Sequence, residues 1–168
     1  MIIWLVGMMG AGKSTVGRAL AEELGTSFHD TDTTVESITG MPIPDLWDRE
    51  GEKAFRELEA AVVETMARTH TGVIATGGGV VLDAARRHLM RDSGTVVWLK
   101  VPVEVLARRV ERSSNRPLLE GEGSPKARLA VILQERGEAY EQAADISIDA
   151  GDSSTDHIVR ELMPLWNP

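Results

Sequence analysis

The sequence contains no cysteine, so the chain can form neither a disulfide bond nor a thiolate metal site. No apolar run approaches the roughly 20 residues that a membrane-spanning helix needs. The first residues, "MIIWLV", include no basic segment and no small-residue cleavage site, so we expect no signal peptide. Together these absences favour a cytoplasmic protein that is not attached to a membrane.

A surplus of positive charge is also missing. The chain has 18 Lys and Arg against 26 Asp and Glu, which gives a net charge of −8. Such a chain has no general attraction for nucleic acids or anionic membranes, and we expect neither as a partner. Any anion that the protein binds must therefore be held by local groups.

The composition is otherwise that of an ordinary globular protein. The 168 residues, 42% hydrophobic and 26% charged, suffice for one compact domain. Short β-branched apolar segments alternate with segments of helical spacing. The expected strands are 2–6, 27–32, 72–76, 95–101 and 145–150, and the expected helices are 13–25, 51–70, 83–92, 102–113, 125–144 and 152–163. This alternation predicts the α/β class, with a mostly parallel sheet and helices on both faces.

Two stretches show no clear pattern, Thr34 to Asp48 and Arg112 to Pro125. We expect loops there, and loops of this length in a compact domain are often functional. The last helix is expected to begin after a cap at Asp152 or Ser153.

The segment "GMMGAGKSTVG" follows the expected first strand and matches the pattern G-x-x-x-x-G-K-S from Gly7 to Ser14. Glycines let the backbone curl until its N–H groups point at phosphate oxygens, and the helix that begins near Lys13 adds its positive dipole end. Lys13 would reach the β- and γ-phosphates and Ser14 would give its hydroxyl to magnesium. Because a chance glycine-rich turn would rarely fall between a strand and a helix, we interpret the segment as a phosphate-binding loop.

Two carboxylates, Asp30 and Asp32, end the expected second strand. The carboxyl ends of strands face the ligand crevice of an open α/β sheet, so these side chains could serve a metal and a substrate hydroxyl. A helix cap is an equally good interpretation, because Asp often precedes a helix such as "TTVESI".

Further along, three glycines, Gly77 to Gly79, follow a strand. Three glycines cost backbone entropy unless something approaches the backbone closely, which favours a site. Arg56 taken alone is best explained as a surface residue that pairs with Glu59 at i,i+3.

Two other groups of arginines are ambiguous when each is taken alone. Four arginines fall within the nine positions from 108 to 116, and this density indicates either a solvated face or an anion-binding lid. They are Arg108, Arg109, Arg112 and Arg116. Arg136 and Tyr140 lie one helical turn apart, which is a weak signal by itself.

In their joint order, the motifs "GMMGAGKST", "FHDTD", "FRELE", "ATGGG", "RRVERSSNRPLL", "RGEAY" and "IDAGDSS" resemble those of the shikimate kinases, small ATP-dependent kinases of the aromatic amino-acid pathway. The resemblance covers nearly the whole chain. It implies a three-layer P-loop fold of the nucleoside-monophosphate-kinase type with a five-stranded parallel sheet. It also implies transfer of phosphate from ATP, with Mg²⁺, to the 3-hydroxyl of shikimate, giving shikimate 3-phosphate and ADP.

The resemblance also assigns roles to residues. Lys13, Asp32 and Arg116 would be catalytic, and Ser14 and Asp30 would serve the metal. The ATP site would comprise Gly10, Ala11, Gly12, Lys13, Ser14, Thr15, Arg109 and Arg116. The shikimate site would comprise Asp32, Arg56, Gly77, Gly78, Gly79 and Arg136. Residues 1–168 would form a single kinase domain, in which 31–60 is the acceptor-binding subdomain and 112–125 the lid.

Some alternatives stay open at this point. A gluconate-type kinase would share the fold and the first motif, and a non-catalytic nucleotide-binding regulator would need no acceptor site. Trp47 could lie at the edge of the acceptor site or simply pack in the subdomain. No acid follows the strand that contains "VIA", so a conventional second carboxylate motif is missing there. Size and the lack of an obvious oligomer stripe favour a monomer.

Overall fold

The computed structural model describes residues 1–110 and 124–166. Its centre is a five-stranded sheet in the order β2-β3-β1-β4-β5, in which every neighbouring pair is parallel. The strands are β1 (Ile2–Val6), β2 (Phe28–Asp30), β3 (Gly72–Ala75), β4 (Thr95–Lys100) and β5 (Ile146–Asp149). The predicted α/β class and the predicted five-stranded parallel sheet are confirmed.

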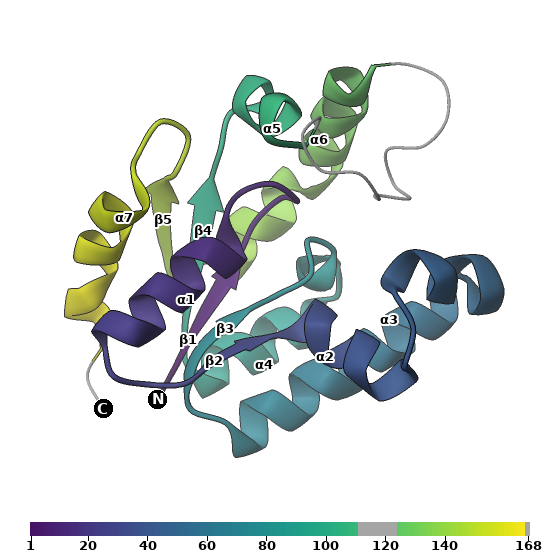
Figure 1. Cartoon of the computed structure of the whole chain (residues 1–168), viewed down its shortest axis with the longest axis horizontal. Coiled ribbons are helices and arrows are strands. Elements are labelled where there is room, and N and C mark those ends of the chain that lie inside the picture. Colours follow the sequence, from purple (N-terminus) through teal and green to yellow (C-terminus); the bar gives the residue numbers. More distant parts are fainter. Residues whose placement is uncertain (111–123, 167–168) are drawn as a thin grey trace.

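Helices cover both faces of the sheet (Figure 1). One face carries α1 (Lys13–Glu23) and α7 (Thr155–Leu162), which pack against each other. The other carries α4 (Ala84–Ser93) and α6 (Pro125–Ala143), with α5 (Val103–Val110) against α6. Two more helices, α2 (Thr31–Thr39) and α3 (Ile43–Thr69), pack on each other beyond the β2 end of the sheet. Short 3-10 turns, η1 (Val80–Leu82) and η3 (Met163–Leu165), complete the described elements.

The core explains why the strands are short apolar runs. All five residues of β1 are at most 2% exposed, because parallel strands between two helical layers are buried on both faces. The strand register places Val6 opposite Trp98, and Asp30 opposite Ala75. The carboxyl ends of β1, β2 and β3 therefore meet at one edge of the sheet, where the polar motifs follow.

The loop expected at 34–48 is wrong, because this stretch contains most of α2 and the start of α3. Asp30 caps α2 by accepting hydrogen bonds from the N–H groups of Asp32 and Thr33, and Gly40 ends the helix with a φ of 69°. The stretch "TTVESIT" is rich in β-branched residues, which lower helix propensity and hide the helical pattern. The remainder of α3 bends at Gly51, whose φ of 84° and ψ of 166° are not helical.

The expected cap of α7 is also wrong by one or two positions. The N-cap is Ser154, whose side chain accepts from the N–H of His157 at 3.2 Å. Of the expected lid, 112–125, only Ser124 and Pro125 are described; Ser124 is the N-cap of α6. Arg112 and Arg116 lie outside the described residues.

Candidate active site

The phosphate-binding loop joins β1 to α1, and its glycines are required by its shape. Gly10 and Gly12 have φ of 79° and 93°, values that favour glycine. A Cβ at Gly7 would lie 2.8 Å from the carbonyl oxygen of Leu99, so the loop also approaches the end of β4 closely. Gly12 is the N-cap of α1 and has no side chain to satisfy the first N–H groups of the helix. Those N–H groups, with the helix dipole, suit a phosphate.

Lys13, the first residue of α1, folds its side chain back over this loop. Its ammonium donates to the carbonyl oxygens of Gly7 at 2.8 Å and Met8 at 3.0 Å. The cation is thereby held against the concave loop, which is the place that the sequence predicted for it.

Ser14 and Asp30 come together, as the predicted metal site requires. The Ser14 hydroxyl donates to Oδ2 of Asp30 at 2.7 Å, while Oδ1 of Asp30 caps α2. The cap interpretation of Asp30 is thus confirmed, and it leaves one carboxylate oxygen directed at Ser14. Hydroxyl and carboxylate oxygens suit Mg²⁺, which is usually held by one or two protein groups together with substrate phosphates and water. In the part of the chain that the structure describes, no cluster of three or more His, Asp or Glu side chains could replace this arrangement.

A pocket of about 350 Å³ adjoins the phosphate-binding loop. It is lined by Gly10, Ala11, Gly12, Thr15, Val16, Arg109, Ala150, Ser153, Thr155 and Ile158. The guanidinium of Arg109 ties its two sides together, because it donates to the carbonyl oxygens of Gly10 and Ala11 on one side and of Ala150 and Gly151 on the other. The segment after β5 and Arg109 therefore border one pocket, as the resemblance implies for the adenine.

Asp32 lies in the first turn of α2, between the phosphate-binding loop and the turn of Gly77 to Gly79 after β3, which we call the glycine turn. Its Oδ1 is buried and has no hydrogen-bond partner. Burial, and after it the neighbouring charge of Asp30, raise the pKa of Asp32 to about 6, although the ammonium of Lys13 acts in the opposite direction. A buried, unsatisfied acceptor of this kind is poised to receive a hydroxyl from a ligand.

The glycine turn after β3 is crowded on both sides, which explains its composition. A Cβ at Gly77 would meet Oε1 of Glu59 and Oδ1 of Asp32, both closer than 3 Å. A Cβ at Gly79 would lie 2.5 Å from Nη1 of Arg56. Since neither glycine has a positive φ, close approach of charged side chains is what excludes any larger residue. The close approach that the three glycines predicted is confirmed.

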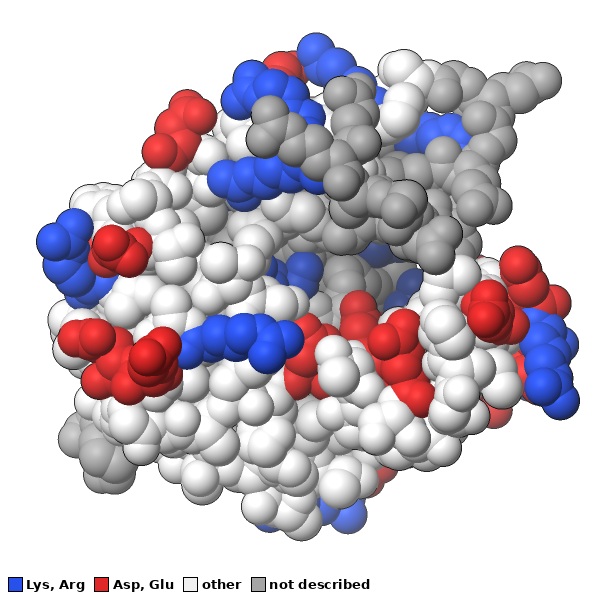
Figure 2. Space-filling model, in the orientation of Figure 1, with Lys and Arg blue, Asp and Glu red and all other residues white. Residues whose placement is uncertain are grey.

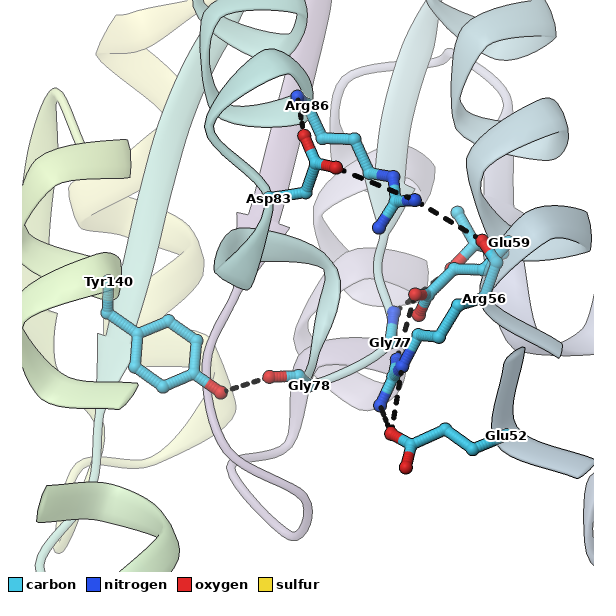
Figure 3. A network of polar contacts seen from close by, with 9 residues as sticks. Glu52, Arg56, Glu59, Gly77, Gly78, Asp83, Arg86 and Tyr140 are labelled. Atoms are coloured by element: carbon cyan, nitrogen blue, oxygen red, sulfur yellow. Dashed lines mark hydrogen bonds and ion pairs between the residues drawn. The ribbon is translucent and has the colours of Figure 1, made fainter. Parts of the chain in front are cut away.

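Arg56 is held by two acids and two aromatic rings. Its Nη1 lies 2.8 Å from Oε2 of Glu59, and its Nε lies 3.4 Å from Oε1 of Glu52 (Figure 3). Its guanidinium also lies over the rings of Trp47 and Phe55, which stack on each other. The expected pairing of Arg56 with Glu59 is confirmed, but Glu59 is completely buried, so the pair is no surface feature. Trp47 packs against Phe55 beside this arginine, a position that fits both alternatives given for it.

Arg136 and Tyr140, on α6, border the other side of the glycine turn. Arg136 is only 7% exposed, and the Tyr140 hydroxyl donates to the carbonyl oxygen of Gly78 at 2.6 Å (Figure 3). Burial raises the pKa of Tyr140 to about 12, against the opposing effect of the Arg136 and Arg56 guanidinium groups. The charges of both arginines therefore act on one buried hydroxyl, although Arg56 and Arg136 come from different helices.

The structure thus brings the predicted residues that it describes to one edge of the sheet; Arg116 lies outside the described residues. Figure 2 shows a hollow in this face, bordered by both acidic and basic side chains. In the sequence, Glu59 and Tyr140 stand out only because each lies three or four positions from an arginine. Nothing in their spacing showed that Glu59 is buried, with Oε1 unpaired, beside Asp32.

No helix within residues 1–110 and 124–166 is both long enough and apolar enough to cross a membrane.

Comparisons with known sequences agree with this geometry. The family model of shikimate kinase matches residues 9–166. The shikimate kinase of Halorhodospira halophila is 44% identical over 161 residues, which cover 96% of this chain and 90% of that protein. The shikimate kinase of Thioalkalivibrio sulfidiphilus is 42% identical over 160 residues, covering 95% and 84% respectively.

Solved structures give the same result. A shikimate kinase from Acinetobacter baumannii in complex with shikimate has a TM-score of 0.93 and 39% identity, covering 98% of this chain and 91% of that one. A gluconokinase from Sinorhizobium meliloti, with a TM-score of 0.57 and 22% identity over 96% of this chain and 89% of that one, shares the fold alone. The P-loop kinase fold is therefore confirmed, and the chain belongs to the shikimate kinase family.

Proposed function

We propose that this site transfers the terminal phosphoryl group of ATP to the 3-hydroxyl of shikimate, with the roles of its residues divided between two halves. The observation that carries the proposal is the meeting of unlike groups at one sheet edge. The phosphate-binding loop, with Lys13 folded over it, lies beside the turn of Gly77 to Gly79. The carboxylate of Asp32 and the guanidinium of Arg56 both lie against this turn, and Tyr140, whose hydroxyl donates to Gly78, lies near Arg136.

The acceptor half matches the two ends of shikimate. Its carboxylate suits Arg56 and Arg136, because a guanidinium forms two parallel hydrogen bonds with a carboxylate. Its hydroxyls suit the unpaired Oδ1 of Asp32. Gly77 to Gly79 allow the small ring to approach the backbone. Trp47, over which the Arg56 guanidinium lies, would form the edge of this half.

The nucleotide half binds and orients the phosphates of ATP. The N–H groups from Gly10 to Thr15 would hold the phosphates, Lys13 would leave its carbonyl partners for the β- and γ-phosphates, and Arg109 would border the adenine in the adjoining pocket. Ser14 and Asp30 would hold Mg²⁺, which would supply positive charge to neutralise the phosphate oxygens. The hydroxyl and carboxylate at 2.7 Å fit such a cation.

Phosphoryl transfer passes through a loose transition state, so catalysis depends mainly on alignment and on nearby cations. Asp32 would accept the hydrogen bond of the attacked hydroxyl, and its raised pKa suits a group that receives the proton. Lys13 would stabilise the charge on the transferred group. From the family resemblance, Arg116 would do the same from a lid at 112–125, and the subdomain at 31–60 would close over the acceptor.

A coupled assay of ADP release tests the proposal. ADP release from ATP-magnesium alone should be slow and should rise strongly with shikimate, because the acceptor hydroxyl completes the site. Gluconate, a hydroxy acid that lacks the ring, is the matched control and should leave the rate at its basal level. Equal turnover with and without shikimate would contradict the proposal.

A further inference from the structure

Arg86 is a largely buried cation to which the proposed chemistry gives no role. Its side chain is 17% exposed. Its Nη2 donates to the backbone carbonyl oxygen of Arg56 at 3.3 Å, which links α4 to α3 across 30 positions of sequence (Figure 3). A helical carbonyl has a second lone pair, so this bond adds to the helix's own bond without replacing it.

Arg86 is itself held in place by the start of α4. Asp83, the N-cap of this helix, accepts from the backbone N–H of Arg86 at 3.2 Å. The other oxygen of the same carboxylate lies 3.9 Å from Nη2 of Arg86. Because α4 follows η1 and the glycine turn directly, Arg86 belongs to the same wall of the site as Gly77 to Gly79.

Arg56 touches this wall at two points. Its guanidinium lies against Gly79, where a Cβ would come within 2.7 Å of three guanidinium atoms. Its carbonyl oxygen meets Arg86. The two contacts together restrain both the position and the rotation of this turn of α3. The contact with Gly79 alone would let the turn move away from the glycine turn and α4.

We propose that Arg86 is a positioning residue for the acceptor: it holds the Arg56 turn of α3 at the distance from Gly79 at which the Arg56 guanidinium meets the acceptor carboxylate. The proposal rests on the acceptor-binding role of Arg56 given above. It predicts that Arg86 affects acceptor binding without affecting the nucleotide half.

The test compares Arg86→Gln with Arg91→Gln. Arg91 is on the same helix and also contacts a backbone carbonyl and a carboxylate, those of Gln142 and Asp145, but away from α3. Arg86→Gln should raise the KM for shikimate by about three- to tenfold, a fraction of the effect of a full charged hydrogen bond. The KM for ATP and kcat should stay within about twofold of the parent. Arg91→Gln should lower the melting temperature similarly and leave the KM for shikimate unchanged.

Conservative variants keep the test decisive if Arg86→Gln folds poorly. Arg86→Lys retains a donor for the Arg56 carbonyl and should restore much of the acceptor affinity. Asp83→Asn keeps the cap oxygen but loses the charge that orients Arg86, and should give an intermediate KM. A KM for shikimate equal to that of the parent in Arg86→Gln would overturn the proposal.

A double-mutant cycle with Arg56→Lys shows whether Arg86 acts through Arg56. If it does, Arg86→Gln adds almost nothing once Arg56 is already replaced. Independent, multiplicative effects on KM would overturn the proposal. An unchanged KM for shikimate in Arg56→Lys would show that Arg56 does not bind the acceptor, and would overturn the present inference. Absence of shikimate-dependent ADP release in the parent protein would instead refute the proposed function.

Discussion

At the scale of single residues, Asp32 combines its proposed role in binding the acceptor with a cost to stability. Its carboxylate is largely buried beside other acids, and burial is the main reason that its pKa rises to about 6. The folded protein therefore binds this proton more tightly than the unfolded chain does. The free energy of unfolding should fall as pH rises from about 4 to about 6, and the full penalty should remain above that range.

Asp32→Asn should therefore stabilise the ligand-free protein while it removes activity. In metal-free buffer at pH 8, we expect the free energy of unfolding to rise by about 2–3 kcal/mol, the energy equivalent of the pKa shift. The gain should shrink as the pH falls below 6 and vanish at about pH 3, where the Asp32 carboxyl is neutral in both the folded and the unfolded state. Urea unfolding at several pH values measures this. Asp48→Asn, which removes an exposed carboxylate carried by α3, is the control for the loss of a negative charge as such.

The opposite sign at pH 8, a loss of stability in Asp32→Asn, would mean that the ionised carboxylate has a partner in the folded protein. That result would contradict the unpaired acceptor on which the proposed hydroxyl contact depends.

At the scale of elements, the bend in α3 gives the acceptor side its shape. Gly51 has a φ of 84° and a ψ of 166°, a region that is essentially restricted to glycine. The bend separates the turn that carries Trp47 from the turn that carries Arg56, and the two side chains meet across it. A straight helix could not place them in the same way.

Gly51→Ala should cost about 1–3 kcal/mol of stability, because alanine cannot adopt this conformation without strain. It should also weaken shikimate binding, since Trp47 and Arg56 would no longer meet. Chemical unfolding and equilibrium titration measure the two effects. Gly137→Ala is the matched control: its Cβ would meet nothing within 4 Å in α6, so it should be neutral or slightly stabilising. Equal stability of the two variants would show that the bend does not depend on glycine.

The same elements show what could be predicted from sequence. The strands and the phosphate-binding loop were predictable, because apolar runs and glycine spacing are local signals. The helix α2 was predictable only in part: Asp30 indicated a cap for a helix at "TTVESI", but the β-branched residues obscure the helical period, and Gly40 is seen to end the helix only in the structure. The crowding of Gly77 by Glu59 and Asp32 was not predictable either, since it depends on how α2 and α3 pack around the end of β3.

At the scale of the whole molecule, the two halves of the site are mechanically joined. The backbone N–H and the side-chain hydroxyl of Thr76 both donate to the carbonyl oxygen of Leu5 at 3.1 Å, which links the end of β3 to the end of β1. A Cβ at Gly78 would lie 3.5 Å from the backbone of Gly7 and of Met9. The glycine turn therefore packs directly on the phosphate-binding loop.

Because of this contact, binding at one half should order the other and lower the cost of the second binding event. We expect ADP-magnesium, which supports no turnover, to tighten the binding of shikimate by about 5- to 150-fold, the range of a typical coupling free energy. Calorimetric titration of shikimate with and without saturating ADP measures the factor. Thermodynamic linkage requires shikimate to tighten ADP binding by the same factor, so the reverse titration is an internal check. Identical affinities in both titrations would mean that the glycine turn and the phosphate-binding loop touch without exchanging free energy.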